Sequence, residues 1–312
     1  MFNSIQNDFS AGYTDLQIFQ SGTAQTDEEN TIFTDTEETT ESEETNAVTE
    51  YAVQDEVKVV AHRGYSYQAP ENTIPAFEKA VENGYDTVEC DIGWTKDDVP
   101  VIIHDSTINR TARNSIGFKP IFPKWCSDMT YDKLQKYDFG SWFSSEYKGT
   151  KIPTFDELLQ CGSENNLDLY VELKEGSGFD EEKAQILLQS LEGSGMEDKI
   201  TWISFDESYL EIIKNLMPDA RLGYLSRSSV SEDTIDTLDS LKTDENEVFL
   251  DIKSSKIDEE GSEMLSDAGY DFEAWTVNSS DKLSDLAELN CKGITTDKLS
   301  KDEVVQIFSS NG

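Results

Sequence analysis

The sequence has 312 residues, of which 64 are acidic and 25 are basic, so the formal net charge is −39. A negative field of that size repels nucleic acid and argues against anionic lipid surfaces as general partners, and an anionic substrate would need a metal ion or a placed Arg or Lys. No apolar run is long enough for a transmembrane helix, and the four cysteines lack the CxxC spacing of a zinc cage.

Residues 1–56 contain no Lys or Arg and are rich in Thr, Ser, Glu and Asp. Such a segment repels itself and has little apolar surface to bury, so we expect a disordered acidic tether; a partner-binding arm is the alternative. No signal peptide is visible in the sequence. An acidic tether ahead of a folded unit favours an exported or cell-surface protein whose export signal lies outside this sequence.

From residue 57 to residue 312, short apolar runs alternate with segments of helical periodicity. Eight strand–helix units predict an α/β protein with a (β/α)8 TIM barrel, and the alternative open sheet lacks a Gly-rich nucleotide fingerprint. The predicted strands are residues 57–62, 86–92, 167–173, 200–205, 220–225, 247–252, 271–277 and 292–296. The predicted helices include residues 73–83, 155–165, 181–191, 208–216, 283–289 and 301–308.

One apolar run, residues 101–104, breaks this alternation. It follows the second strand after only residues 93–99, which are too few for a helical crossover. We therefore expect the return arm of a hairpin that turns at residues 95–98. Residues 106–150 then form a predicted insertion, and insertions at this face of a barrel commonly shape the substrate site.

The only two histidines, His62 and His104, each end an apolar run. Histidine exchanges protons near neutral pH, so the pair predicts acid/base chemistry, although hydrogen-bonded histidines at strand ends are the alternative. Between them, Glu89 and Asp91 share one face of a strand, where two like charges are unfavourable without a cation, a proton or an Arg. A divalent cation is the natural partner at this end of a barrel strand, and a solvated strand end is the alternative.

Glu172 and Lys174 repeat this arrangement on the next predicted strand. Three carboxylates from two strands could hold Ca²⁺ or Mg²⁺ and leave positions for water and substrate oxygens. Lys174 would then contact a phosphate or orient Glu172. A simple ion pair between Glu172 and Lys174 is the alternative.

Six short motifs occur in a fixed order along the chain. They are His62-Arg63-Gly64, Pro70-Glu71-Asn72-Thr73, Glu89-Cys90-Asp91, His104-Asp105, Glu172-Leu173-Lys174 and Trp275-Thr276-Val277-Asn278. Each alone is weak evidence, but the ordered set resembles the glycerophosphodiester phosphodiesterase family over about residues 57–310. One departure is Asp98, where the family usually has Gly in the hairpin turn.

The resemblance implies metal-dependent hydrolysis of glycerophosphodiesters to sn-glycerol 3-phosphate and an alcohol. It places a divalent ion, Ca²⁺ or Mg²⁺, on Glu89, Asp91 and Glu172. It also makes His62 and His104 the general acid and base, in an order that the residues leave open.

The resemblance also implies substrate-binding residues. Arg63 would contact phosphate, Glu71 would lie in the site, and Trp275 would line the alcohol side. Asn72 would cap the next helix or contact the site.

Two other functions stay open at this point. A lysophospholipase D would need a wide apolar groove and access to a membrane. A non-catalytic module that only holds a metal is disfavoured by the intact histidines and carboxylates. The small-molecule substrate is the expected partner, and oligomeric state is not indicated.

Overall fold

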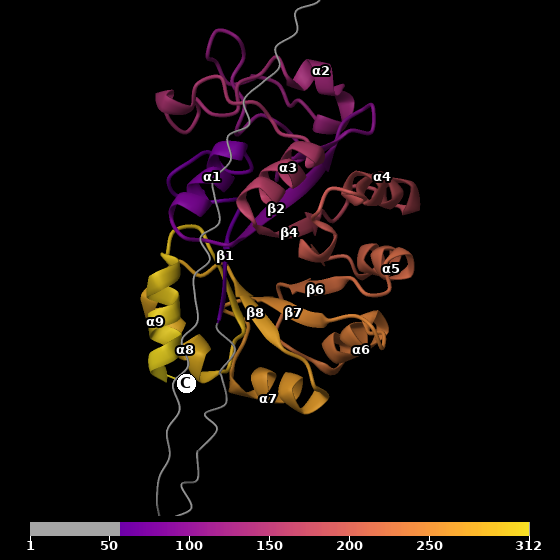
Figure 1. Ribbon diagram of the computed structural model, residues 1–312, viewed down its shortest axis with the longest axis vertical. Coiled ribbons are helices and arrows are strands. Elements are labelled where there is room, and N and C mark those ends of the chain that lie inside the picture. The colour runs from indigo at the N-terminus through magenta and orange to yellow at the C-terminus, as the bar shows by residue number, and fades with distance from the viewer. Residues whose placement is uncertain (1–56, 312) are drawn as a thin grey trace, which may run out of the picture. The chain divides into compact units, whose positions relative to one another are not determined.

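The computed structural model describes residues 57–311, so the predicted tether at residues 1–56 lies outside the described residues. Within residues 57–311, eight parallel strands close into a barrel, because β1 pairs with both β2 and β9 (Figure 1). The barrel strands are β1 Lys58–Ala61, β2 Thr87–Trp94, β4 Asp168–Leu173, β5 Ile200–Ser204, β6 Arg221–Ser226, β7 Val248–Lys253, β8 Phe272–Trp275 and β9 Gly293–Thr296. The predicted (β/α)8 barrel is thereby confirmed.

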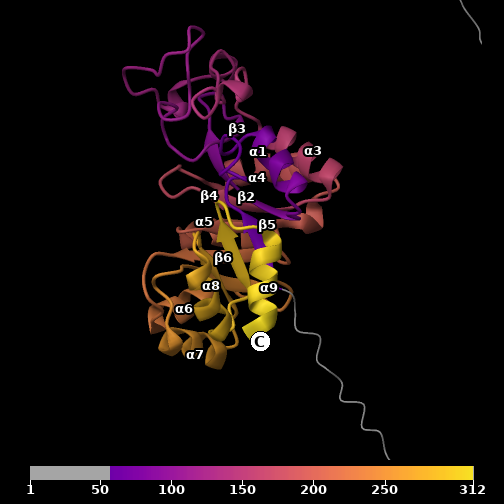
Figure 2. The ribbon, with the colours of Figure 1, turned by 90° about the vertical axis from the view of Figure 1, so that its left-hand side faces the viewer.

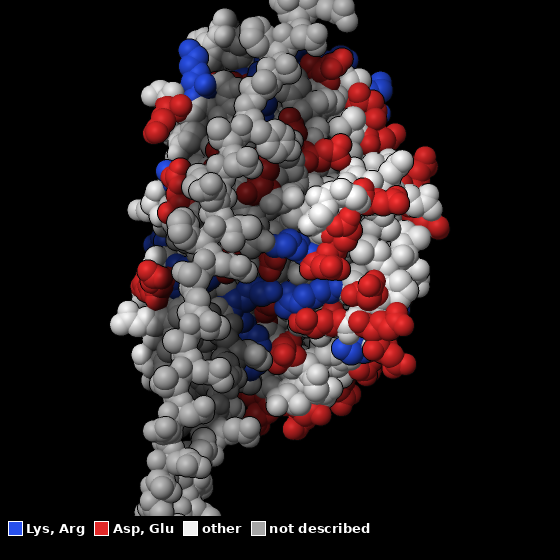
Figure 3. All heavy atoms as spheres, in the orientation of Figure 1, with Lys and Arg blue, Asp and Glu red and all other residues white. Residues whose placement is uncertain are grey.

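Helices surround the strands. They are α1 Ile74–Glu82, α3 Phe155–Asn165, α4 Glu181–Leu191, α5 Glu207–Leu216, α6 Glu232–Leu241, α7 Glu259–Ala268, α8 Ser280–Glu288 and α9 Lys301–Asn311. Local sequence explains their starts: Thr154 and Glu157 form a capping box at α3, and acidic side chains occupy the first turns of α4 and α7. Figure 3 shows many carboxylates on the side of the molecule covered by α4 to α7.

The predicted hairpin is present. Strand β3, Pro100–Ile102, runs antiparallel to β2, with Ile92 opposite Ile102. In the turn, Asp98 has a φ of 55°, which is the left-handed region that glycine adopts most easily. Asp tolerates that region better than most residues, so Asp98 can stand in a turn position that favours glycine.

The chain between β3 and α3 folds into a unit of its own. It contains two single-turn 3-10 helices, η1 Cys126–Asp128 and η2 Ser145–Tyr147, and the short helix α2 Tyr131–Leu134. A separate apolar cluster that includes Ile108, Leu134, Phe139 and Ile152 holds this unit together. Figures 1 and 2 both show it projecting from the opposite end of the molecule to α7.

Alternation along the barrel strands decides which side chains reach the site. Cys90 is buried in the core between strands and helices, whereas Glu89 and Asp91 on either side of it point to the other face. The inside of the barrel is filled by large side chains such as Tyr170 and Phe249. None of the helices in residues 57–311 has the length and apolar character needed to cross a membrane.

Candidate active site

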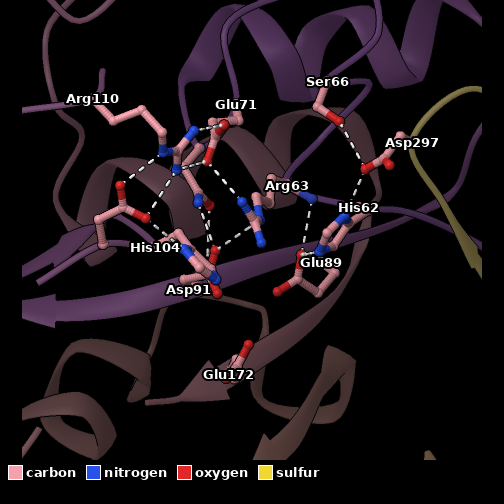
Figure 4. Close-up of polar contacts among 12 residues, drawn as sticks. His62, Arg63, Ser66, Glu71, Glu89, Asp91, His104, Arg110, Glu172 and Asp297 are labelled. Atoms are coloured by element: carbon pink, nitrogen blue, oxygen red, sulfur yellow. Dashed lines mark hydrogen bonds and ion pairs between the residues drawn. The ribbon is translucent and has the colours of Figure 1, made fainter. Parts of the chain in front are cut away.

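A cavity of about 260 Å³ lies at the carboxyl ends of the barrel strands. Seven of the residues predicted from the sequence contribute to its wall: His62, Arg63, Glu89, His104, Glu172, Lys174 and Trp275. Segments that are far apart in the sequence therefore meet at one place, as Figure 4 shows for most of the charged residues. Asp91 and Glu71 are the two predicted residues that lie behind this wall rather than in it.

The backbone after β1 holds the first histidine and the first arginine in place. Arg63 and Gly64 both have positive φ values, 58° and 73°. A Cβ on Gly64 would lie 2.6 Å from the backbone carbon of Ala76, so only glycine fits this close approach to α1. The amide of Arg63 then donates a 2.9 Å hydrogen bond to Glu89, which joins the loop after β1 to β2.

His62 has a carboxylate partner that the sequence analysis missed. Its Nδ1 lies 2.6 Å from Oδ1 of Asp297, and Ser66 donates to the same oxygen (Figure 4). Burial acts to raise the pKa of Asp297, but the hydrogen bond and charge of His62 outweigh it and lower that pKa to about 2. Asp297 directly follows β9, and position at the end of a barrel strand was the available signal.

His104 is oriented in a comparable way. Its Nδ1 lies 2.8 Å from Oδ1 of the adjacent Asp105, whose Oδ2 accepts a 2.7 Å bond from Nε of Arg110. The hydrogen bond from His104 and that from Arg110 lower the pKa of Asp105 against the effect of its burial. Arg110 was also missed, because it lies in the predicted insertion outside every motif.

Glu71 links the two arginines of the site. Its Oε1 accepts a 2.9 Å bond from Nη1 of Arg63 and a 2.8 Å bond from Nη2 of Arg110. Burial acts to raise the pKa of Glu71, but the bonds and charges of the two arginines outweigh it and lower that pKa. Glu71 thus holds the guanidinium of Arg63 in position.

Three carboxylates converge beside the histidines. Ligand oxygens of Glu89, Asp91 and Glu172 all lie within 4.8 Å of one another, and all three residues are buried. The Nδ2 of Asn72 donates a 2.7 Å bond to Asp91, so Asn72 contacts the site. The Nζ of Lys174 lies 2.8 Å from Glu172 and 3.2 Å from Asp91, so the ion pair considered above is present and extends to a second carboxylate.

The electrostatics of this group show an excess of negative charge. Burial and the charge of Asp91 raise the pKa of Glu89 and also that of Glu172. Burial acts to raise the pKa of Asp91 as well, but Lys174 and Arg63 outweigh it and lower that pKa. The donors are carboxylate oxygens only, which is what hard divalent cations prefer, so the group is a possible metal site.

Apolar side chains also line the cavity. Trp275 packs edge-on against Phe205, with ring centroids 5.5 Å apart, and its Nε1 donates to the backbone oxygen of Asp251. The side chain of Asp251 also borders the cavity, and its buried Oδ1 has no hydrogen-bond partner among the described residues. Burial and the charge of Glu273 raise the pKa of Asp251. No sequence motif indicated Asp251 or Phe205.

Comparisons with known proteins show the family to which the chain is related. The model of the glycerophosphoryl diester phosphodiesterase family matches residues 62–301. A glycerophosphodiester phosphodiesterase of Bacillus altitudinis is 28% identical over 246 residues, covering 77% of this chain and 94% of the relative. One from Caldanaerobacter subterraneus is 32% identical over 174 residues, covering 56% of this chain and 68% of the relative.

Solved structures give the same result. An Oleispira antarctica phosphodiesterase, determined in complex with the product sn-glycerol-3-phosphate, has a TM-score of 0.70 and 28% identity, covering 82% of this chain and 96% of its own. Fold and site together define a barrel enzyme that hydrolyses phosphoric diesters. The chain belongs to the glycerophosphoryl diester phosphodiesterase family.

Proposed function

We propose that this chain hydrolyses glycerophosphodiesters to sn-glycerol 3-phosphate and an alcohol in a metal-dependent reaction. Deacylated phospholipids such as glycerophosphocholine are the proposed substrates. The observation that carries the proposal is that both histidines border one cavity with a group of three converging carboxylates. The family match and the product-bound relative support the same reaction.

Glu89, Asp91 and Glu172 would hold the metal ion. Three buried carboxylates face two nearby cationic side chains, Arg63 and Lys174. The group therefore keeps an excess of negative charge that a divalent ion would neutralise. Their donor atoms are all oxygens, which fits Ca²⁺ or Mg²⁺ rather than a metal that prefers thiolate ligands. When bound, the ion would supply electrostatic stabilisation of charge on a phosphate oxygen.

Arg63 and Lys174 would bind the phosphate. Arg63 is held by Glu71 and by its own backbone bond to Glu89, so its guanidinium is already oriented before substrate arrives. Preorganised donors of this kind stabilise the charge that develops in the transition state without a cost of reorganisation. On the alcohol side, Trp275 and Phe205 would exclude water around the leaving group.

His62 and His104 would exchange the protons. The Nδ1 of His62 is hydrogen-bonded to Asp297, and the Nδ1 of His104 is hydrogen-bonded to Asp105. In each ring Nε2 is therefore the nitrogen that would take part in the reaction. One Nε2 would take the proton of the attacking hydroxyl and the other would protonate the leaving oxygen. Each such transfer contributes about 10²–10⁴-fold to the rate.

The first nucleophile in this proposal is the 2-hydroxyl of the glycerol, which gives a cyclic phosphate that water then opens. This step rests on the family resemblance. A substrate analogue without the 2-hydroxyl should therefore react poorly. Its turnover at the rate of the normal substrate would exclude the cyclic intermediate.

The direct test is release of glycerol 3-phosphate from glycerophosphocholine, measured after EDTA treatment and again after Ca²⁺ or Mg²⁺ is returned. We expect EDTA to abolish turnover and one of the two ions to restore it. Absence of turnover with several glycerophosphodiesters, in protein shown to bind the ion, would contradict the proposed reaction.

A further inference from the structure

One short loop carries nearly all the large apolar side chains that are exposed in residues 57–311. Those side chains are Tyr67 and five residues of the loop 114–125, namely Ile116, Phe118, Ile121, Phe122 and Trp125. Their exposed fractions run from 50% for Trp125 to 91% for Ile121. Several large apolar side chains exposed together mark an interaction site, whereas single exposed apolar residues need no explanation.

The loop is built to present these side chains. Asn109 anchors its base: Nδ2 donates to the backbone oxygens of Pro120 and Phe122, and Oδ1 accepts from the amide of Lys124, at 2.8–2.9 Å. The side chain of Asn114 accepts from the amides of Ile116 and Phe118. Side chains of this segment thus form hydrogen bonds with the backbone of the loop. The loop would therefore lose little conformational freedom on binding.

The charge around the loop differs from that of the rest of the protein. Residues 106–150 contain seven Lys and Arg against four Asp and Glu, although the whole chain has a net charge of −39. Lys124, Lys133 and Lys136 border a hollow of about 830 Å³ that also includes Trp125. Asp128 is the one carboxylate that borders this hollow, and among residues 57–311 no ion pair is formed by these three lysines or by Lys119.

The loop is also connected with the proposed active site. A groove of about 320 Å³ is lined by His104 and Lys174 and also by Trp125, the last residue of the loop. His104 and Lys174 also border the cavity described above. A molecule held at the loop would therefore have a path along the surface to the catalytic histidine.

We propose that the loop 114–125 docks onto an anionic lipid surface. Trp and Phe bury well at the boundary of a bilayer, while Lys side chains keep their ammonium groups at the headgroups. The net charge of the chain argued against such a surface, but charges more than about 10 Å away are largely screened at physiological salt. Local lysines and apolar side chains therefore decide the interaction.

The test uses the full chain and its sedimentation with vesicles, so it does not depend on the proposed reaction. One set of vesicles is phosphatidylcholine alone, and the other is phosphatidylcholine and phosphatidylglycerol in equal parts. We expect binding to the mixed vesicles, weakened by added salt, and little binding to phosphatidylcholine. Lys119→Ala with Lys124→Ala should weaken binding at least about tenfold, since each Lys near an anionic surface contributes about 1 kcal/mol.

A matched control removes two lysine charges from other parts of the protein, with Lys214→Ala on α5 and Lys282→Ala on α8. This control should bind as wild type. A second variant, Phe118→Ser with Phe122→Ser, should lose binding while its thermal unfolding midpoint stays unchanged, because both side chains are exposed.

Three results would overturn the proposal. They are absence of binding to the mixed vesicles, equal loss of binding in the control, and equal binding to both kinds of vesicle. Self-association of the wild type that the Phe variant abolishes, without vesicle binding, would assign the loop to a contact between two copies of the chain instead.

Discussion

The Nδ1 of His62 and the Oδ1 of Asp297 lie 2.6 Å apart, although 235 positions separate the two residues in the sequence. His62 follows the first strand of the barrel and Asp297 follows the last one. Closure of the barrel between β1 and β9 brings them together, and the amide of His62 donates a hydrogen bond to the backbone oxygen of Thr296. The orientation of the first proposed catalytic histidine therefore depends on the ring being closed.

This pair predicts how stability depends on pH. The pKa of Asp297 is lowered to about 2 from an ordinary 3.8, so the folded state binds its proton less tightly than the unfolded state. The stabilising contribution is therefore complete above about pH 4 and is lost as pH falls toward 2. Asp297→Asn should be less stable than wild type near neutral pH, and the difference should shrink at about pH 3.

Urea unfolding of both proteins across this pH range measures the effect. A difference in the free energy of unfolding that stays constant with pH would show that the carboxylate charge plays no part. Asp239→Asn, on the outer helix α6, serves as a control for a changed carboxylate remote from His62.

Replacement of either histidine should remove activity and keep the fold. For His62→Ala or His104→Ala we expect turnover to fall by about 10²–10⁴-fold, because one proton transfer loses its catalyst. Glycerol 3-phosphate release and the circular dichroism spectrum are the two measurements. Near-normal turnover in either variant would remove that histidine from the acid/base pair.

Arg110 should affect the reaction through His104. Arg110→Ala removes the link between Asp105 and Glu71, and loss of orientation at a reacting group costs up to about 10²-fold in turnover. Arg110→Lys should recover part of this loss, because Lys keeps the charge but cannot form the forked contact. Lys148→Ala, which removes an exposed charge from the same part of the chain, should have no effect.

The measurement is kcat and KM for each of these variants. A positioning role predicts a lower kcat with a smaller change in KM. A rise in KM alone would indicate that Arg110 contacts the substrate.

The proposed metal site makes a prediction that needs no substrate. A bound ion stabilises the folded state by mass action, so Ca²⁺ or Mg²⁺ should raise the thermal unfolding midpoint of EDTA-treated protein. Glu89→Gln or Glu172→Gln should greatly reduce this rise, whereas Glu182→Gln on the exposed side of α4 should leave it unchanged. An equal rise in all four proteins would place the ion elsewhere.

The sequence was sufficient for the barrel and for most of the site because both depend on local patterns. Alternation predicted that Glu89 and Asp91 share a face, and the short link to residues 101–104 predicted the hairpin. Arg110 needed information that a sequence pattern does not contain, namely how the segment after β3 folds back. Asp297 directly follows the last predicted strand, and it was missed because it belongs to no motif. Asp251 was missed because a single carboxylate inside an apolar strand has no pattern.

The insertion joins the barrel at two neighbouring points. It begins after β3 and ends before Thr154, and the backbones of Thr154 and Val101, a residue of β3, form an antiparallel bridge. A segment whose two ends lie side by side can be exchanged for another of different length with little strain on the rest of the protein. The barrel could thus carry other surface-recognition segments in this position, provided that each keeps an arginine in the place of Arg110, whose bonds to Asp105 and Glu71 belong to the site.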